Sequence, residues 1–420
     1  MNIKINHIAK MEGHAGFMMS VLHGDVQSAK IEVQEGIRLI EGILIGRHFK
    51  DVPVIAQRIC GICPVVHNLT AIKAVENAFG IIETQETEAL RKLLEWAQFI
   101  HSHALHLFFL SLADFLDIEN DLQLVSEYPK QAKQAIQLRE FGMLIVRTVG
   151  GRVVHPLTNE AGGFKKVPTV EELQEMIQMG EKALPVALEL GAFFRGVRVP
   201  DFTRATEYVC LEKNGEYAIY DGDLVSNKGL RIPVSKFEAN FHELHRPKEM
   251  IKRVESDLKT SYNIGAIARV NIQRDKLNTE AEKYLGTFGF QFPDYNPFHN
   301  IYYQMVEVIQ AIEDSLKILK NLGHLDLQNA LSQPFEVKEG IGVAAVEAPR
   351  GTLFYHLDID ARGYVKNANI ITPTAQSLSN MEDDVKAYLP RVLELPPHER
   401  EKKLRALIRA YDPCISCAVH

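Results

Sequence analysis

Four of the five cysteines in this 420-residue sequence form two Cys-x-x-Cys pairs near opposite ends of the chain. The first pair is Cys60 and Cys63, and the second is Cys414 and Cys417. Thiols at this spacing can bind one metal ion from a single turn of backbone, and thiolates favour soft transition metals. Two such pairs complete a four-thiolate site if the fold joins the chain ends. The sequence therefore predicts a metal site and a topology in which the two ends meet.

The sequence around each pair favours thiolate, the form that binds metal. Pro64 suits the first position of a helix, and the apolar periodicity after it predicts a helix over residues 65–79. Cys63 would then lie at a helix N-terminus, where the partial positive charge favours thiolate over thiol. Pro413 ends the helical pattern before the second pair, so we expect Cys414 to follow an extended segment.

Three kinds of site are compatible with two such pairs. A structural zinc module usually has its pairs roughly 15–20 residues apart, whereas Cys63 and Cys414 are 351 positions apart, which leaves only a zinc site that closes the fold. A thiol redox motif needs one pair and leaves the second pair unexplained. The third possibility is a sulfur-rich site for nickel or iron that carries out chemistry.

The two motifs resemble those of the large subunit of nickel–iron hydrogenases. They read Arg-x-Cys-Gly-x-Cys-x-x-x-His at residues 58–67 and Asp-Pro-Cys-x-x-Cys-x-x-His at residues 412–420. The resemblance spans essentially the whole chain, because it extends to Glu12-Gly13-His14, Glu41, Glu347-Ala348-Pro349-Arg350-Gly351 and Thr372-Pro373-Thr374. The short chain and its stretch of histidines at 101–106 look most like the cytoplasmic, bidirectional, sulfhydrogenase-type branch.

The resemblance implies a mainly α fold with small β-sheets, that is, an α+β large-subunit fold around a central bundle of long helices. The sequence pattern predicts strands within residues 1–35, 203–235 and 335–372, and helices over residues 86–116, 128–150, 171–194, 247–262 and 297–322. No repeat or low-complexity linker marks a boundary. We therefore expect residues 1–420 to form one intertwined catalytic domain in which the N- and C-terminal cysteine motifs meet at the metal site.

The resemblance also implies a nickel–iron centre and its chemistry. All four motif cysteines would bind nickel: Cys60 and Cys414 terminally, Cys63 and Cys417 as bridges that also bind iron. The iron would carry carbon monoxide and cyanide ligands made elsewhere. The implied function is reversible heterolytic cleavage of H2 into protons and electrons, which needs electron-rich metals and a base.

Other site residues are implied at positions that match the family. Glu12 would relay protons by general acid–base transfer, and Arg350 would lie over the metals as a base or as a donor to cyanide. Thr374 would donate to a cyanide, and Asp412 could pair with Arg350. His67 would donate a hydrogen bond to a bridging sulfur.

A separate Mg²⁺ or Fe²⁺ site is implied at Glu41 and at His420, the last residue of the sequence. The family completes this ligand set with one backbone carbonyl, which we assign to Leu378. In relatives a maturation protease removes a C-terminal tail just after the motif histidine. We expect His420 to be buried, close to a cation that Glu41 also approaches.

Three further features of the sequence are not expected to bind metal. His103 and His106 share a helix face and are expected to form hydrogen bonds inside the bundle, whereas His101 points elsewhere. Ser102 stands where many membrane-bound relatives have an acidic residue, so the charge balance around Arg350 must differ. The remaining cysteine, at position 210, is expected to be a small buried apolar residue.

Composition limits the partners and the location. The net charge of −7 and the pI near 6.2 argue against nucleic acid as a partner. We expect no membrane span and a cytoplasmic location, because no apolar run approaches about 18 residues, the N-terminus lacks a signal-peptide pattern, and reduced cysteines suit the cytosol.

Electrons must leave through another polypeptide, because no further cysteines are available for an iron–sulfur cluster and no Gly-x-Gly-x-x-Gly motif follows a strand. The implied partners are an iron–sulfur small subunit and flavin-containing subunits that reach NAD(P) or ferredoxin. The alternative is a subunit without hydrogenase activity, either like the large subunit of respiratory complex I or stabilised by zinc. The complex I relatives have lost these cysteines, which argues against the first of these.

Overall fold

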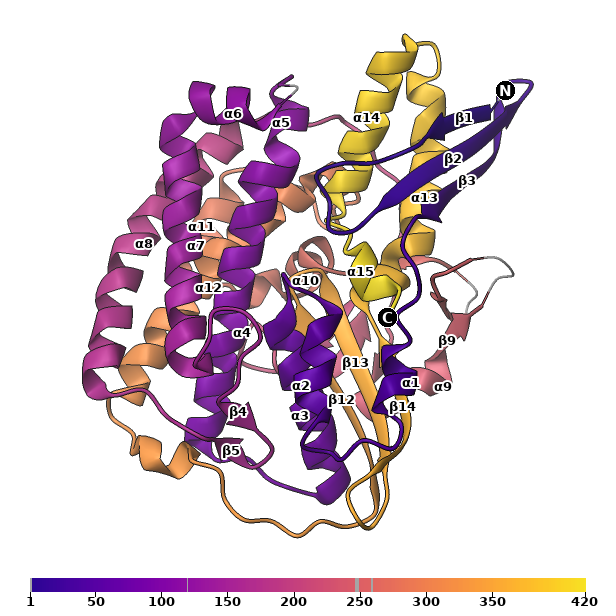
Figure 1. Cartoon of the computed structure of the whole chain (residues 1–420). Helices are drawn as coiled ribbons and strands as arrows, with labels where there is room; N and C mark the ends of the chain where they lie inside the picture. The colour runs from indigo at the N-terminus through magenta and orange to yellow at the C-terminus, as the bar shows by residue number, and fades with distance from the viewer. Residues whose placement is uncertain (1, 119, 246–248, 258–259) are drawn as a thin grey trace.

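Four long helices form a bundle in the computed structural model, which describes residues 2–118, 120–245, 249–257 and 260–420 (Figure 1). They are α4 (Gln85–Leu105), α7 (Pro129–Gly150), α8 (Val170–Gly196) and α12 (Asn300–Leu322). Thr84 and Thr169 cap α4 and α8, because each hydroxyl accepts a hydrogen bond from a backbone N–H in the first turn. Helix α12 packs against α4 and α8, and most of its side chains are buried. The prediction of a mainly α fold with small sheets is confirmed.

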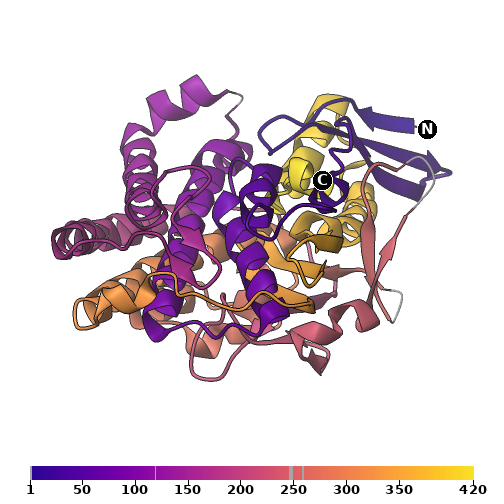
Figure 2. The ribbon, with the colours of Figure 1, turned by 60° about the horizontal axis from the view of Figure 1, so that its bottom comes forward.

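Helix α3 (Pro64–Phe79), which begins at the first cysteine pair, lies between the bundle and an antiparallel sheet (Figures 1 and 2). The sheet consists of β12 (Gly340–Ala348), β13 (Gly351–Ile359) and β14 (Val365–Ile371). A Cβ atom at Gly342 would lie only 1.8 Å from the carbonyl oxygen of Ala74. This glycine therefore lets β12 approach the backbone of α3 closely.

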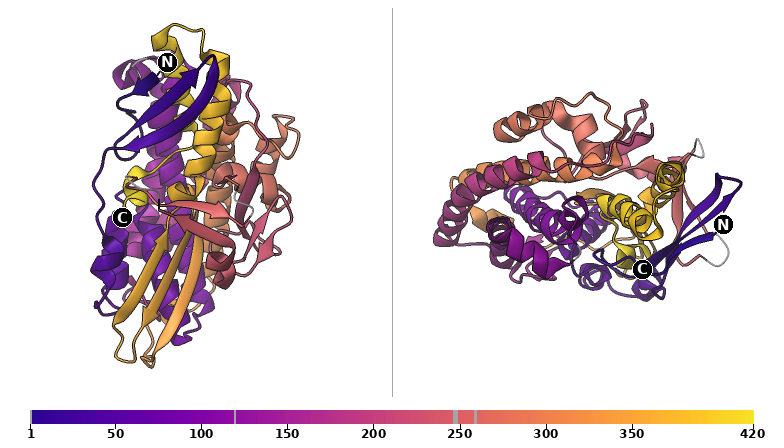
Figure 3. Two further views of the ribbon diagram at one scale, coloured as in Figure 1. Left: turned by 90° about the vertical axis from the view of Figure 1, so that its right-hand side faces the viewer. Right: turned by 90° about the horizontal axis from the view of Figure 1, so that it is seen from above.

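The first strands of the chain pack beside its last helices (Figure 3). The antiparallel sheet β1 (Asn2–Ile5), β2 (Ala15–Leu22) and β3 (Asp25–Val33) shares a core with α13 (Pro373–Val392) and α14 (Pro397–Ala410). This core brings the loop between β1 and β2 close to the segment that follows α14.

The other elements are shorter. A four-stranded sheet has the order β11-β6-β7-β8, and β4-β5 and β9-β10 are two-stranded. The strands are β4 (Asn159–Glu160), β5 (Gly163–Phe164), β6 (Glu207–Glu212), β7 (Asp223–Ser226), β8 (Arg231–Ile232), β9 (Phe241–Leu244), β10 (Arg253–Ser256) and β11 (Tyr262–Asn263). The α-helices are α1 (Ile40–Leu44), α2 (Val52–Ala56), α5 (Leu112–Phe115), α6 (Asp121–Glu127), α9 (Phe237–Asn240), α10 (Ala266–Gln273), α11 (Thr279–Gly286) and α15 (Ile415–Ala418). Short 3-10 turns are η1 (Gln57–Ile59), η3 (Val234–Lys236), η4 (Arg274–Lys276), η5 (Pro297–His299) and η6 (Leu327–Ala330), and η2 (His106–Ser111) is π-helical.

The predicted helix over residues 247–262 is wrong where the structure describes it. Residues 247–248 and 258–259 of that range lie outside the described residues. Strand β10 instead pairs with β9 in an antiparallel hairpin. Ile251 and Val254 have helical spacing, but they join two different core clusters, so they do not form one helix face.

The predicted helix over residues 86–116 is observed as three consecutive segments. Helix α4 passes into the π-helical turn η2 and then into α5. Among residues 2–118, 120–245, 249–257 and 260–420, every helix is too short or too polar to traverse a lipid bilayer.

Candidate metal centre

The structure brings the four motif cysteines together. Their Sγ atoms all lie within 4.8 Å of one another, and all four residues are buried. Cys60 Sγ is 3.6 Å from Cys414 Sγ, and Cys63 Sγ is 3.4 Å from Cys417 Sγ. Since metal–sulfur bonds are about 2.3 Å long, one ion at the centre could bind all four thiolates.

The backbone favours negative charge on these sulfurs. Cys63 is the N-cap of α3 and Pro64 its first residue, as the sequence predicted, so the positive end of the helix faces the site. The backbone N–H groups of Ile62 and Cys63 donate to Cys60 Sγ at 3.3 and 3.2 Å. Burial raises the pKa of Cys60, but hydrogen bonds from the other three thiols and the charge of Arg350 outweigh burial and place this pKa well below its usual value. The surroundings of Cys60 therefore favour its thiolate form even before a metal binds.

The second pair is anchored by the N-terminal region. The backbone of Glu12 forms a bridge with Cys414, and Ile415 N–H donates to the carbonyl oxygen of Glu12 at 2.9 Å. Gly13 has φ +83°, and a Cβ there would lie 2.8 Å from Ile415 Cβ. A side chain at this position would therefore separate the two segments. Arg38 donates to the carbonyl oxygens of Ile59 and Ser416 and so joins the two cysteine turns directly.

A carboxyl group lies directly against the sulfurs. Glu12 Oε2 is 3.0 Å from Cys414 Sγ and 3.0 Å from Ser416 N, and Oε1 accepts from the Ser416 hydroxyl. Glu12 is only partly buried, so it connects the thiols with the protein surface. This arrangement can pass a proton between a sulfur and solvent.

A small cavity adjoins Cys63, Cys414 and Cys417. It is lined by Cys63, Val66, His67, Ala348, Arg350, Leu353, Pro373, Thr374, Cys414 and Cys417. Most of this lining is apolar, with one buried cation and one hydroxyl. The cavity can therefore take a small group with a hydrogen-bond acceptor, next to the sulfurs but out of water.

Comparison with known proteins identifies the centre. Residues 38–185 and 262–420 match the family described as nickel-dependent hydrogenase. The chain belongs to this family. It is the catalytic large subunit of a nickel–iron hydrogenase, an oxidoreductase that acts on H2.

The hydrogenase is similar to several curated proteins over its whole length. It is 31% identical to sulfhydrogenase 1 subunit alpha of Pyrococcus furiosus, covering 100% of this chain and 97% of that protein. It is 28% identical to the NAD-reducing hydrogenase HoxS subunit beta of Cupriavidus necator, covering 99% of this chain and 94% of that protein. The predicted similarity to the sulfhydrogenase-type branch is thus confirmed.

The fold of the hydrogenase matches solved structures. An NAD⁺-reducing [NiFe]-hydrogenase in the H2-reduced state superposes with a TM-score of 0.90 and 23% identity, covering 100% of this chain and 99% of that one. A [NiFeSe]-hydrogenase of Dm. baculatum has a TM-score of 0.78 and 20% identity, with 100% of both chains covered.

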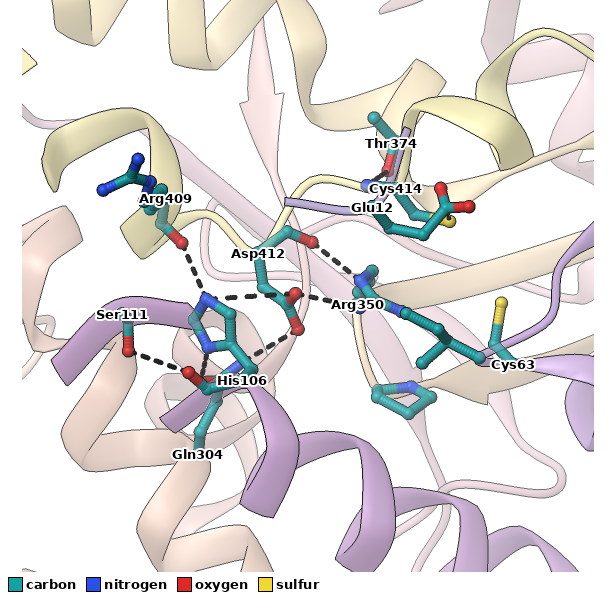
Figure 4. A network of polar contacts seen from close by, with 12 residues as sticks. Glu12, Cys63, His106, Ser111, Gln304, Arg350, Thr374, Arg409, Asp412 and Cys414 are labelled. Atoms are coloured by element: carbon teal, nitrogen blue, oxygen red, sulfur yellow. Dashed lines mark hydrogen bonds and ion pairs between the residues drawn. The ribbon is translucent and has the colours of Figure 1, made fainter. Parts of the chain in front are cut away.

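The predicted pairing of Arg350 with Asp412 is present in this hydrogenase (Figure 4). Arg350 donates through Nη2 to Asp412 Oδ1 at 2.9 Å and through Nε to the Asp412 carbonyl oxygen at 2.8 Å. Its Nη1 is buried and has no partner among the described residues. Burial lowers the pKa of Arg350, but the charges of Asp412 and the thiolates outweigh burial and keep this pKa well above its usual value. A fixed cation with one free donor therefore lines the cavity.

Thr374 and His67 both line the cavity beside the cysteines. Thr374 Oγ1 accepts from Cys414 N at 3.0 Å, so its hydroxyl hydrogen is available to the cavity. His67 Nδ1 is 2.8 Å from the Tyr355 hydroxyl. Burial lowers the pKa of His67 to about 3, so its ring is neutral. Its hydrogen bond to a bridging sulfur remains a prediction.

Glu41 and His420 meet at a second polar site. His420 Nε2 is 3.8 Å from Glu41 Oε1, and the His420 side chain is only 5% exposed. The Lys252 ammonium also lies 3.1 Å from Glu41 Oε2. Burial raises the pKa of Glu41, but His420, the Ile370 N–H and Lys252 together lower it to about 2. The site therefore holds an ionised carboxylate beside a ring nitrogen.

The assignment of Leu378 to this second site is wrong. The nearby backbone carbonyl belongs to Ile370, whose oxygen is 2.8 Å from His420 Nε2 and whose N–H donates to Glu41 at 2.8 Å. Leu378 lies inside α13, where its carbonyl is committed to the helix, and its side chain is in the second core cluster. A strand end can turn a carbonyl toward a site, whereas a helix interior cannot.

The histidines of α4 and η2 lie inside the protein, as expected. His103 Nε2 is 2.8 Å from Glu307 Oε2, and His106 Nδ1 is 2.6 Å from Gln304 Oε1, so both face α12. His101 instead contacts Gln98. His103 and His106 therefore bind polar side chains of α12 inside the bundle.

Several residues that position the site carried no clear sequence signal. The Arg38 guanidinium donates to the Ser416 carbonyl oxygen, and Ser416 N–H donates to the Glu12 carboxyl group. Gln98 donates to Ile62 O and accepts from Val65 N. Of these three residues, Ser416 alone lies inside a motif, between the second pair of cysteines. Cys210 is buried in β6, as predicted.

Proposed function

We propose that this subunit holds nickel between the four thiolates, with iron and its carbon monoxide and cyanide ligands in the adjoining cavity. The single observation that carries the proposal is the cavity lined by three of the four cysteines, namely Cys414 and the two assigned as bridges, Cys63 and Cys417. A zinc site with four cysteine ligands needs no adjoining cavity. When bound, such a centre would supply the electron-rich metals at which H2 is split into protons and electrons.

The lining suits small anionic ligands. Arg350 Nη1 is a buried donor without a partner among the described residues, and the Thr374 hydroxyl can donate as well. Helices α3 and α13 both begin at the cavity, with Pro64 and Pro373 as their first residues. The positive ends of both helices favour negative charge there. Cyanide nitrogen atoms are acceptors that these groups could bind, and the apolar wall suits carbon monoxide.

Glu12 is proposed to carry protons between the centre and solvent. Its Oε2 atom already contacts Cys414 Sγ at 3.0 Å, within range of direct proton transfer. Ser416 holds the carboxyl group in this orientation through its N–H and hydroxyl. The outer side of Glu12 is open to the surface, so a proton need not cross the core.

Electrons are proposed to leave beside Gly61. This residue is exposed between the first two cysteines, and a Cβ there would meet no atom within 4 Å. The only cysteine outside the centre, Cys210, is buried in a strand and offers no cluster site. We therefore propose an iron–sulfur small subunit as the partner and, beyond it, flavin-containing subunits that reach NAD(P) or ferredoxin. The names of the relatives, which include subunits of sulfhydrogenases and an NAD-reducing hydrogenase, support this arrangement.

A second cation, Mg²⁺ or Fe²⁺, is proposed at Glu41, His420 and the Ile370 carbonyl. A carboxylate, a carbonyl and a ring nitrogen suit a divalent ion that keeps several waters. The Lys252 ammonium competes for the same carboxylate, so we expect modest affinity. A cytoplasmic location is proposed as well, since the centre needs reduced thiols, with a maturation protease acting near His420.

Elemental analysis and infrared spectroscopy of the purified complex test the proposal. We expect about one nickel and at least one iron per chain, with carbon monoxide and cyanide stretching bands. Zinc alone, without these bands, would indicate the zinc-stabilised alternative. No metal would indicate the alternative that resembles complex I.

A further inference from the structure

His106 links the end of α14 to the Arg350–Asp412 pair (Figure 4). Its Nδ1 atom lies 2.6 Å from Gln304 Oε1, and its Nε2 atom lies 2.8 Å from the carbonyl oxygen of Arg409. The same Nε2 atom is 3.9 Å from Asp412 Oδ1. His106 is only 2% exposed, so its ring nitrogens are shielded from bulk water.

These partners determine which ring nitrogens carry hydrogen. A carbonyl oxygen can only accept, so Nε2 must be protonated. Gln304 donates through its amide nitrogen to Asp412 Oδ2 at 3.2 Å, and Arg350 donates to Oδ1 of the same carboxylate at 2.9 Å. The Gln304 amide therefore presents its oxygen to Nδ1, which must carry a hydrogen as well. A ring with hydrogen on both nitrogens is an imidazolium cation.

The position of His106 at the end of α14 favours the same charge. The last carbonyls of a helix have no partner within it and carry partial negative charge. His106 donates to the carbonyl oxygen of Arg409, in the last turn of α14. The chain then continues directly into Asp412 and Cys414, so the ring also fixes the start of the second cysteine motif.

The helix that carries His106 changes geometry at this residue. The π-helical turn η2 begins at His106, and the Ser111 hydroxyl is 3.1 Å from the His106 carbonyl oxygen and 3.2 Å from that of Leu107. Such turns are rare and are often found at functional sites. This one adjoins the contact with Asp412.

We propose that His106 is a buried imidazolium ion that positions the Asp412 carboxylate and, through it, the Arg350 guanidinium beside the metal centre. The inference deepens the proposed function, on which its catalytic consequence rests. Asp412 then lies between two cations, His106 and Arg350. His106 contacts no metal ligand, so its role is one of positioning. Since Ser102 is neutral, these groups carry a net positive charge beside anionic sulfurs.

Other charged groups near His106 already have partners of their own. From α5, Asp114 pairs with the Arg409 side chain at 2.6 Å. From α12, Glu307 is held by Arg269 at 2.6 Å and by His103 at 2.8 Å. Asp412 is therefore the carboxylate to which the His106 charge couples.

A neutron structure of the complete hydrogenase, exchanged into D2O, tests the protonation directly. We expect deuterium on both ring nitrogens of His106. Deuterium on one nitrogen alone would overturn the assignment. This measurement does not depend on nickel content, so it is separate from the test of the proposed function.

The positioning role is tested by His106→Gln, with His103→Gln as the matched control. Both residues are buried and face α12, but His103 contacts Glu307 rather than Asp412. In His106→Gln we expect nickel and iron to be retained, the cyanide and carbon monoxide bands to shift, and H2 turnover to fall roughly 10- to 100-fold. In His103→Gln the bands should stay in place.

Unshifted bands with wild-type turnover in His106→Gln would overturn the positioning role, as would equal band shifts in both variants. If His106→Gln does not fold, the neutron measurement on the wild-type protein still decides the protonation. A wild-type protein without nickel or infrared bands would refute the proposed function and leave the protonation result unaffected.

Discussion

Replacing Glu12 with glutamine should stop proton transfer while leaving the metal site intact. Glutamine has nearly the same shape, and its amide oxygen can accept from Cys414 and Ser416 N, as Oε2 does now at 3.0 Å. The amide nitrogen would then face the Ser416 hydroxyl, which can accept instead of donate. We expect stability to change by less than about 1 kcal/mol, since no buried group loses its partner.

The kinetic effect should be much larger, because an amide does not carry a proton at neutral pH. A positioned general acid or base typically contributes roughly 10²- to 10⁴-fold to a rate. That range corresponds to about 2.7–5.4 kcal/mol in the activation barrier. We therefore expect Glu12→Gln to lose two to four orders of magnitude in turnover, as an estimate from general acid–base catalysis.

The assay compares H2 uptake, H/D exchange and metal content in purified wild-type and variant complexes. Glu35→Gln is the matched control, since Glu35 is a nearby carboxylate that accepts from His14 N and has no contact with a sulfur among the described residues. Wild-type H/D exchange in a fully metal-loaded Glu12→Gln complex would refute the proton route. Loss of nickel from this variant would instead make Glu12 a structural residue.

Three further predictions concern separate parts of the protein. Cys417→Ser should abolish nickel binding and H2 uptake together, whereas Cys210→Ala should keep both; nickel retention in Cys417→Ser would contradict its role as a ligand. Glu41→Gln should lose the second cation but keep nickel, as measured by elemental analysis, and an unchanged Mg²⁺ or Fe²⁺ content would remove Glu41 from that site. Burial raises the pKa of Glu307, but Arg269 and His103 lower it to about 2, below its usual value of 4.5. The ionised carboxylate therefore stabilises the fold by about 3 kcal/mol above pH 4.5, and this stabilisation is lost as the pH falls toward 2. Urea unfolding of Glu307→Gln should show lower stability than wild type at neutral pH and a smaller loss of stability below pH 4.5. A loss of stability below pH 4.5 as large as that of the wild type would contradict this prediction.

The sequence predicted the elements whose signals are local. Residues 65–79 have an apolar face and lie between Pro64, which suits a helix start, and Gly80, which suits a helix end. They form α3 nearly as expected. The helix over residues 247–262 failed because Ile251 and Val254 have helical spacing for unrelated reasons, each facing a separate core. The spacing of apolar residues cannot distinguish residues on one helix face from residues that pack into two separate cores.

The site could be predicted where side-chain identity carries the chemistry. The roles of the cysteines, Glu12 and the Arg350–Asp412 pair could be predicted because thiol, carboxyl and guanidinium groups each suit a limited set of roles. Backbone ligands carry no such signal, which is why the carbonyl of Leu378 was chosen where that of Ile370 lies at the site. The double protonation of His106 also required geometry, since it follows from its acceptors and not from its residue type.

The C-terminal cysteine segment is held by polar contacts from distant parts of the chain. Its only regular structure is the short helix α15, and Glu12, Arg38 and Arg350 each contact its backbone or side chains. These contacts place one carboxyl group and two guanidinium groups around a segment that itself carries Asp412 and two thiols. Burial raises the pKa values of Cys414 and Cys417 well above the usual range, which favours protonated thiols when no metal is bound. Metal binding removes these protons and adds bonds between the two cysteine pairs. Folding of the C-terminal cysteine segment and metal binding at the four cysteines should therefore stabilise each other.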